Sequence, residues 1–373
     1  MHSPFRQNKL GIGIFIIAAI IIAAVLVVPG KKTLFVNEST SETTTSSLKG
    51  SLENDKKSTQ AQTNVAEIKA PEISGWIAWW EEEDGFRVAE ANSQKISEIS
   101  PGWLKLDKNQ ALVEVGKVDK SAETQKIKAS GMKFYPMLSC ELSDKELAAF
   151  IEGPKNIDNF SKDLINKLKD FQADGVDIDI ENIDEQYSSD FSLFIKSLRE
   201  ALQKNNLKVS VTVQAQTGQN DWTGLKGQDL GQIAQNADEV RVMIYDKHGQ
   251  FSNPGPITPM DWYKNVIEYS LKFIPRDKLS IGLPTYGYVW SKDGSFNSYQ
   301  YKDFIKYTQD NQIEMNRDPD SFELEFSNNN ATGWLSDSES VIKKMDYAKS
   351  LGLNRFMIWN LGGTDENLFN YKW

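Results

Sequence analysis

Beyond residue 71, short apolar runs alternate with amphipathic helical stretches, and this alternation constrains the fold more than any other feature. Residues 160–171 are typical of the helices, because Leu164, Leu168 and Phe171 recur at helical spacing. Eight alternating strands predict an α/β fold, a (β/α)8 TIM barrel. A doubly wound open sheet is the alternative, but no glycine-rich dinucleotide turn is present. The candidate strands are residues 73–79, 103–106, 133–139, 175–181, 208–214, 239–246, 279–286 and 356–361.

One interval between the candidate strands is too long for a single loop and helix. About seventy residues separate Tyr286 from Phe356. This stretch is rich in aromatic residues, which favours a small inserted subdomain over an unstructured loop. We therefore predict an α+β insertion at about 291–337, between strands 7 and 8. Its aromatic residues are Tyr299, Tyr301, Phe304, Tyr307, Phe322 and Phe326.

The amino-terminal segment predicts a membrane anchor. Residues 10–28 form an uncharged run of nineteen residues, long enough to cross a hydrocarbon core of roughly 30 Å. Arg6 and Lys9 favour a short cytoplasmic end at residues 1–9, although Lys31 and Lys32 weaken the asymmetry. A cleaved signal peptide, which would give a secreted protein, is the alternative, but its apolar region is usually shorter. Both readings place the folded domain outside the cytoplasm, at the cell membrane if the segment is retained.

A polar linker is predicted between this anchor and the folded domain. All ten Trp and all twelve Tyr follow Pro71, so residues 29–70 have little with which to form a core. Residues 37–69 are rich in Ser, Thr, Asn, Gln and charged side chains, a composition typical of disorder. Such a tether reaches roughly 30 Å. The folded domain is therefore expected to occupy residues 71–373.

Charge and composition exclude several classes of function. The chain has 52 acidic and 42 basic residues, a net charge of -10, so no nucleic-acid partner is expected. Cys140 is the only cysteine, which rules out an intrachain disulfide. With His2 and His248 as the only histidines, a zinc site is not supported. We expect no metal and no cofactor, and we expect a monomer.

Three acidic residues share one face of the fourth candidate strand. Asp177, Asp179 and Glu181 stand at alternate positions, so in a strand they point the same way, while Val176 and Ile178 point to the covering helices. Inside a barrel they project into the lumen, with Glu181 nearest the carboxyl end, where such barrels do chemistry. Adjacent carboxylates raise one another's pKa and tend to share a proton. This pattern predicts a proton-transfer site.

Three other interpretations of the acidic residues are weaker. A solvated acidic edge would not alternate with Val and Ile. A calcium loop needs a glycine-containing turn, whereas these residues lie in a strand-forming run. A phosphatase-like Asp-x-Asp site would have Thr or Val where Glu181 stands.

The acidic segment resembles the D-x-x-D-x-D-x-E motif of glycoside hydrolase family 18, the chitinase family. Further matches follow in the family's order, and the resemblance covers about residues 73–373. Within the family it is similar to the bacterial branch of spore-cortex-lytic N-acetylglucosaminidases, although a transmembrane run and a linker stand where those enzymes often carry LysM modules. The matching residues are Asp174, Asp177, Asp179 and Glu181, then Met243-Ile244-Tyr245-Asp246, Gly282-Leu283-Pro284-Thr285-Tyr286-Gly287 and Trp359.

The resemblance implies a retaining mechanism in which the substrate's own 2-acetamido group is the nucleophile and an oxazolinium ion forms. It implies that Glu181 protonates the glycosidic oxygen and later deprotonates water. Asp179 would accept the acetamido N–H and stabilise the positive charge, and Asp177 would control the protonation of Asp179. Tyr245 would donate its hydroxyl to the acetamido oxygen.

The substrate-binding set also draws on this resemblance. Asp246 would contact the reacting sugar, Trp359 would form the floor of its subsite, and Met243 belongs to the same motif as Asp246. From its position at the end of the fifth candidate strand, Gln214 is predicted to point into the site. Trp79 and its neighbour Trp80 end the first candidate strand, and one of them is predicted to line the cleft.

The implied partner is an N-acetylated polysaccharide, chitin-like or peptidoglycan, cleaved at β-1,4 bonds next to N-acetylglucosamine. A catalytically inactive carbohydrate-binding barrel is one alternative, although inactive members typically lack the acid that Glu181 supplies. A wall-associated scaffold or adhesion protein, in which the anchor matters more than the cleft, is another.

Overall fold

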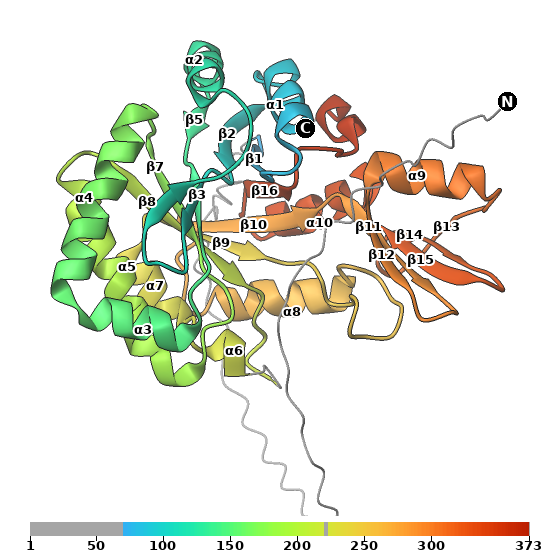
Figure 1. Cartoon of the computed structure of the whole chain (residues 1–373). Helices are drawn as coiled ribbons and strands as arrows, with labels where there is room; N and C mark the ends of the chain where they lie inside the picture. The colour runs from blue at the N-terminus through green and yellow to red at the C-terminus, as the bar shows by residue number, and fades with distance from the viewer. Residues whose placement is uncertain (1–69, 220–222, 373) are drawn as a thin grey trace, which may run out of the picture. The chain divides into compact units, whose positions relative to one another are not determined.

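The structure, a computed structural model, describes residues 70–219 and 223–372. Its larger sheet curls into a TIM-barrel-like α/β fold, as predicted (Figure 1). The barrel strands pair in parallel, and each is buried on the side that faces the helices. They are β1 (Glu72–Ile77), β2 (Ile96–Pro101), β5 (Lys133–Phe134) with β6 (Met137–Cys140), β7 (Gly175–Asp179), β8 (Lys208–Gln214), β9 (Glu239–Met243), β10 (Leu279–Pro284) and β16 (Arg355–Trp359).

The third barrel strand connects the two ends of the sheet. Its first half, β5, pairs with β2, and its second half, β6, pairs with β7. Tyr135 and Pro136 separate the two halves, and a proline cannot donate a ladder hydrogen bond. Asp174, the first acid of the motif, supports this break, because its carboxylate accepts the Phe134 N–H at 2.9 Å and pairs with Lys128 at 3.1 Å.

The second barrel strand differs from the prediction. Residues 103–106 were expected to form it, but that place is taken by β2, and the expected stretch continues beyond it as β3 (Leu104–Leu106), paired with β6 and with β4 (Leu112–Glu114). Glu98 and Ser100 of β2 are buried and polar. Polar residues at buried positions give the sequence of a solvated loop, which explains the miss.

Several strands also end earlier than predicted, so that the candidate site residues lie just beyond the ladder. β7 ends at Asp179 rather than Glu181, and β9 ends at Met243 rather than Asp246. β10 and β16 likewise end two residues before their predicted ends. Glu181, Tyr245 and Asp246 are therefore held by loops at the carboxyl end of the barrel.

Helices pack around the barrel because one face of each is apolar. In α4, Phe160, Leu164 and Leu168 lie four residues apart and are all buried. Local caps define the ends: Ser143 and Glu146 form a capping box on α3, and Gly131 ends α2 in the left-handed region. The helices around the barrel are α1 (Glu82–Ala91), α2 (Lys120–Ser130), α3 (Asp144–Glu152), α4 (Pro154–Asp170), α5 (Ser188–Gln203), α6 (Thr223–Lys226), α7 (Leu230–Asn236), α8 (Met260–Ser270) and α10 (Ser338–Ser350), with short 3-10 helices at Glu185–Tyr187 and Glu366–Asn370.

The chain between β10 and β16 forms a second, antiparallel sheet, and α9 (Tyr301–Asp310) packs on it, orange in Figure 1. It begins at Tyr286, five residues before the predicted start of the insertion, and has its own small core around Val289, Phe304 and Phe326. Its strands are β11 (Tyr286–Ser291), β12 (Phe296–Gln300), β13 (Asn316–Arg317), β14 (Leu324–Ser327) and β15 (Ala331–Leu335).

A buried ion pair fixes this insertion to the barrel. Glu323 and Lys344 of α10 are both fully buried, with 3.3 Å between the carboxylate and the ammonium. Glu323 also accepts the backbone N–H groups of Ile257 and Thr258 at 2.7 and 2.8 Å. The Thr258 hydroxyl in turn donates to the Ile244 carbonyl, so the contacts reach the segment that carries Tyr245. The insertion therefore supports one wall of the site.

We expect Lys344→Met to lower the free energy of unfolding by about 3–5 kcal/mol, because it leaves Glu323 as an unpaired buried charge. Guanidinium denaturation measures this. Lys343→Met is the matched control, since Lys343 is the exposed neighbour on the same helix and its change should stay within about 0.5 kcal/mol. Equal effects of the two substitutions would contradict the assigned role of the pair.

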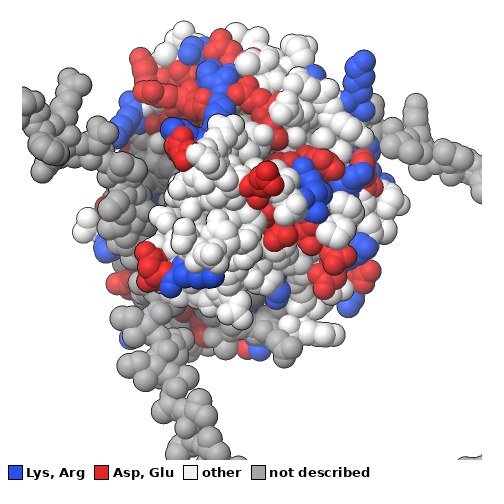
Figure 2. All heavy atoms as spheres, turned by 90° about the vertical axis from the view of Figure 1, so that its right-hand side faces the viewer, with Lys and Arg blue, Asp and Glu red and all other residues white. Residues whose placement is uncertain are grey.

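The surface on the side of the insertion carries both charge signs. Figure 2 shows acidic and basic residues interspersed with broad uncharged areas on this face, without a continuous basic stripe among the residues described. No helix within residues 70–219 and 223–372 is long and apolar enough to cross a membrane. The predicted anchor at residues 10–28 and the linker at 29–70 lie outside the described residues, except for Ala70.

Candidate active site

Asp177, in the middle of β7, is the most enclosed of the three acids. It is fully buried, and its carboxylate accepts a hydrogen bond from Trp76 Nε1 at 2.8 Å. The hydroxyl groups of Ser100 and Ser210 donate to it at 3.1 and 2.8 Å, and Thr212 lies within 3.2 Å of both carboxylate oxygens. The predicted inward direction of Asp177 is therefore correct. Donors from three other strands hold it in place.

Asp179 ends β7 above this network and has a different environment. One of its carboxylate oxygens, Oδ1, is buried without a hydrogen-bond partner among the described residues. Burial raises the pKa of Asp179 well above its usual range, and the charges of Glu181 and Asp177 raise it further. The group therefore tends to hold a proton, and its Oδ1 has unused hydrogen-bonding capacity.

Glu181 lies two residues beyond the end of β7, at the mouth of the barrel. Its side chain is exposed, as a group that meets a substrate must be, but surrounding protein still displaces much of the bulk water. This desolvation raises its pKa to about 7, and the negative charge of Asp246 adds to the shift. Beside it, Gln214 Oε1 accepts the Asn182 N–H at 3.2 Å, so Gln214 holds the loop that follows Glu181.

Tyr245 and Asp246 follow β9, which is separated from β7 by β8 in the sheet. Burial raises the pKa of Tyr245 well above its usual range, and Asp179, Asp246 and Glu181 are all near enough to raise it further. Asp246 adopts a left-handed backbone conformation with φ of 60°. Its carboxylate accepts hydrogen bonds from the hydroxyl groups of Tyr286 and Tyr288. Its own pKa is nevertheless raised, because desolvation outweighs these two hydrogen bonds.

Aromatic side chains surround this group of acids. Trp359, at the end of β16, packs edge-on against Trp76 at 6.1 Å and Trp80 at 6.2 Å between ring centroids. Met243 and Tyr245 pack against the same small cluster. The peptide bond between Trp359 and Asn360 is cis. The aromatic rings of Trp76, Trp80 and Trp359 therefore form an edge-to-face cluster at the end of β16, and the sugar-binding role of Trp359 stays a prediction.

The structure brings most of the predicted site residues to one end of the barrel and refines the place of two. Trp79 is 46% exposed and contacts Trp80, which is the tryptophan that reaches Trp359. Gln214 is bound to the loop after Glu181.

Sequence reasoning missed several residues that support the acids. They are Trp76, Ser100, Ser210, Thr212 and Arg241 around Asp177, and Tyr286 and Tyr288 around Asp246. Only Tyr286 and Tyr288 could have been recognised from the sequence as candidate site residues, because they carry hydroxyl groups at or just beyond the end of a candidate strand. The contacts of the others depend on which strands become neighbours.

Comparison with known protein families gives one match that covers most of the chain. The model of glycosyl hydrolases family 18 matches residues 72–364, which include the acidic strand, the Tyr245 segment and Trp359. The matched region begins with β1 and extends beyond β16, so it contains every strand of the barrel.

Two relatives from one bacterium each share less than 30% sequence identity with this chain. An uncharacterised glycosylase of Bacillus subtilis, YvbX, is 28% identical over 238 residues, covering 61% of this chain and 68% of the relative. The putative sporulation-specific glycosylase YdhD of the same organism is 27% identical over 217 residues, covering 53% of this chain and 50% of the relative. Among solved structures, the spore cortex-lytic enzyme SleL of Bacillus megaterium superposes with a TM-score of 0.72 at 18% identity, covering 82% of this chain and 74% of SleL. This last likeness is one of fold.

Proposed function

This chain belongs to glycosyl hydrolases family 18, and from that membership we propose that it cleaves β-1,4 bonds next to N-acetylglucosamine by a retaining, substrate-assisted mechanism. Family membership makes it a glycoside hydrolase. Two observations carry the finer proposal: the buried Oδ1 of Asp179 has no hydrogen-bond partner among the described residues, and the pKa of Glu181 is raised. The Asp179 oxygen can accept a hydrogen bond from an acetamido N–H. An acid with a pKa of about 7 can protonate a leaving oxygen.

Substrate binding would redistribute the proton of the acid pair. A hydrogen bond from the acetamido N–H to Asp179 favours its charged form. The proton of the pair then resides on Glu181, which is where protonation of the glycosidic oxygen requires it. The acetamido oxygen attacks the anomeric carbon as the bond to the leaving oxygen breaks. Ionised Asp179 stabilises the resulting oxazolinium ion, and the Glu181 carboxylate deprotonates the water that opens it.

The remaining site residues have roles consistent with this sequence of steps. Tyr245, surrounded by Asp179, Asp246 and Glu181, would donate its hydroxyl to the acetamido oxygen. Asp246, oriented by Tyr286 and Tyr288, would accept a sugar hydroxyl, and Trp359 would stack on the apolar sugar face. Trp80 extends this aromatic surface, while Trp79, Met243 and Gln214 shape its border.

The purified full chain, incubated with N-acetylglucosamine oligomers and with purified peptidoglycan, tests the proposal. Release of reducing ends with retained β-configuration is the expected result, and the better substrate identifies the polymer. The predicted position at the cell membrane favours peptidoglycan as the natural substrate. Binding to both polymers without turnover would instead support a carbohydrate-binding barrel.

We expect kcat/KM to fall as the pH rises through about 7, because Glu181 must be protonated and its pKa is raised to that value. In Asp246→Asn the alkaline limb should move to lower pH, since removal of a nearby negative charge favours ionisation of Glu181. A pH–rate profile of both proteins measures this. An alkaline limb that does not move, or that moves to higher pH, would contradict the proposed coupling.

We also propose that residues 10–28 anchor the protein in the cell membrane, with the barrel on the outer side. Fractionation of intact cells, followed by protease treatment, tests this placement. Recovery of a shortened protein in the medium would show that the segment is a cleaved signal peptide instead.

A further inference from the structure

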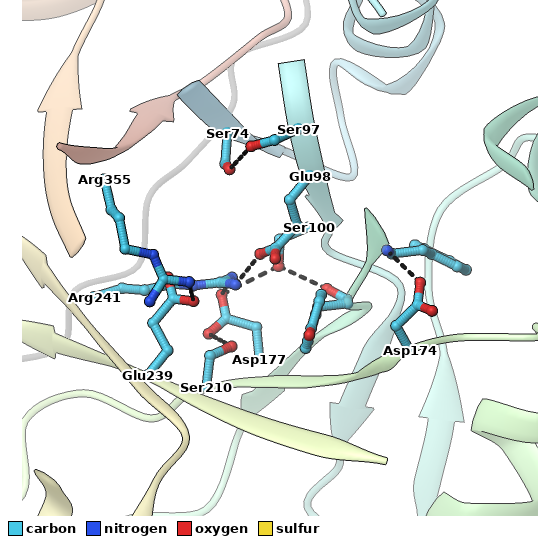
Figure 3. A network of polar contacts seen from close by, with 12 residues as sticks. Ser74, Ser97, Glu98, Ser100, Asp174, Asp177, Ser210, Glu239, Arg241 and Arg355 are labelled. Atoms are coloured by element: carbon cyan, nitrogen blue, oxygen red, sulfur yellow. Dashed lines mark hydrogen bonds and ion pairs between the residues drawn. The ribbon is translucent and has the colours of Figure 1, made fainter. Parts of the chain in front are cut away.

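Arg241 of β9 belongs to a buried polar network with Asp177, Glu98 and Glu239 (Figure 3). Its side chain is fully buried and pairs with carboxylates from three strands: Asp177 of β7, Glu98 of β2 and Glu239 of its own strand. Nη1 lies 2.9 Å from Asp177 Oδ2, and Nε lies 3.2 Å from Glu239 Oε1. The ring of Tyr135 faces the guanidinium at 5.5 Å. Burying one cation among three carboxylates costs free energy unless good pairing geometry and further hydrogen bonds offset the loss of water.

The other two carboxylates have further means of balancing their charge. Arg355 of β16 pairs with Glu239 at 2.6 Å. Burial alone would raise the pKa of Glu239, but Arg241 and Arg355 outweigh it and lower the pKa. Burial raises the pKa of Glu98 to about 7 in spite of Arg241, so near neutrality Glu98 accepts a proton. Among the described residues, Arg241 is thus the one cation that pairs with Asp177, whereas Glu239 also pairs with Arg355.

A polar cavity of about 160 Å³ adjoins this cluster. Glu98, Lys133, Glu239 and Arg355 are among its lining residues, and the last three are the first residues of their strands. The cavity therefore lies at the amino-terminal end of the barrel, opposite the candidate active site. Water that enters there can exchange protons with Glu98, whereas Asp177, on the other side of Arg241, is enclosed by donors.

Every described contact of the Asp177 carboxylate favours its charged form. Trp76, Ser100 and Ser210 donate hydrogen bonds, Thr212 lies within reach of both oxygens, and Arg241 supplies positive charge. The Nη1 contact is not a straight hydrogen bond, so the guanidinium acts here mainly through its charge. Asp179, by contrast, has an unpartnered oxygen. The carboxylates of the two neighbouring aspartates thus differ in their contacts: Asp177 has several donors and a cation, and Asp179 has an unpartnered oxygen.

We propose that Arg241 is a positioning residue: its ion pair with Asp177 holds that carboxylate in place as the negatively charged neighbour of Asp179, so that the single shared proton of the acidic strand moves between Asp179 and Glu181. This inference rests on the proposed substrate-assisted reaction and adds a residue to it. No atom of Arg241 touches the substrate. Its effect reaches the reaction through Asp177, whose fixed negative charge disfavours ionisation of Asp179 until an acetamido group binds.

Arg241→Met in the full chain tests this, with Arg355→Met as the matched control from the same cluster. Without Arg241, buried Asp177 has no cation and competes for the proton. We expect kcat to fall on the order of 100-fold, with KM within about threefold, because the substrate contacts are unchanged. Arg355→Met should leave kcat within about twofold, since Arg355 pairs with Glu239 and not with Asp177. Equal kcat values in the two variants would overturn the proposal.

A second variant separates this role from a loss of stability. Arg241→Met with Glu98→Gln also removes one of the three buried carboxylates that pair with Arg241, and should therefore recover part of the lost thermal stability. If Arg241 acts through Asp177, kcat stays low in this double variant. Recovery of kcat together with stability would show that Arg241 is only structural, and would overturn the proposal.

A direct spectroscopic readout makes the result independent of turnover. In protein with 13C-labelled aspartate carboxyl groups, the Asp177 signal is assigned by comparison with Asp177→Asn. We expect its chemical shift to change in Arg241→Met and to stay the same in Arg355→Met, because Arg241 pairs with Asp177 and Arg355 pairs with Glu239. An Asp177 signal that is unchanged in Arg241→Met would refute the role of Arg241. Absence of turnover with the expected change in chemical shift would refute only the proposed function.

Discussion

Glu181→Gln is expected to lower kcat by roughly 10³-fold, since general acid catalysis contributes about 10²–10⁴-fold. Glutamine has nearly the same shape and can still form hydrogen bonds, but it has no proton to give to the leaving oxygen. KM should stay within about threefold, because the sugar contacts are preserved. Steady-state kinetics on N-acetylglucosamine oligomers measures both constants.

Glu185→Gln is the matched control for this substitution. Glu185 is exposed, lies four residues farther along the chain, and faces Lys226 at 3.6 Å. Its replacement should leave kcat within about twofold, as for most surface changes. Turnover by Glu181→Gln equal to that of the unsubstituted chain would refute the assignment of Glu181 as the acid.

Asp179→Asn is expected to lower kcat by about 10²–10³-fold, a loss comparable to removal of one oxyanion-hole donor. Asparagine can still accept the acetamido N–H through its oxygen. It cannot carry the negative charge that stabilises the oxazolinium ion, and it cannot give up a proton when the substrate binds. The loss should therefore fall mainly on kcat.

Two comparisons make the Asp179 prediction specific. Asp174→Asn removes a charge from the other end of the same strand, where the carboxylate holds the Phe134 N–H and Lys128. It should lower stability by about 1 kcal/mol and leave kcat nearly unchanged. On oligomers with free amines in place of the acetamido groups, the unsubstituted chain and Asp179→Asn should be equally slow. A faster unsubstituted chain on those oligomers would argue against a substrate nucleophile.

The two predictions together separate the acids by environment rather than by residue type. Glu181 is exposed at the mouth of the barrel with a pKa of about 7. Asp179 is half-buried, and its Oδ1 has no hydrogen-bond partner among the described residues, whereas the Asp177 carboxylate accepts hydrogen bonds from Trp76 and Ser210. Three carboxylates at alternate positions of one strand thus have three different relationships to a proton.

Much of the fold followed from local patterns. The alternation of apolar runs and helical stretches predicted the barrel, and the aromatic residues after Tyr286 predicted a structured insertion. The error at β2 has a physical cause. Its buried positions Glu98 and Ser100 are polar because they serve the network below Asp177, so the hydrophobic pattern of a strand is absent there. The strand ends were misplaced where loops hold the site residues.

For the site itself, the sequence determined which side chains share a face. The two-residue period of a strand puts Asp177 and Asp179 on the lumen side, whatever surrounds them. Order along the chain added Tyr245, Asp246 and Trp359 through a family resemblance. Tertiary structure alone decided what each carboxylate contacts. Asp177 meets Arg241 and Trp76 from other strands, and Asp246 meets Tyr286 and Tyr288. Within residues 70–219 and 223–372, Asp179 Oδ1 meets no hydrogen-bond partner. Protonation depends on these long-range neighbours and on burial, neither of which is encoded in the local period of the strand.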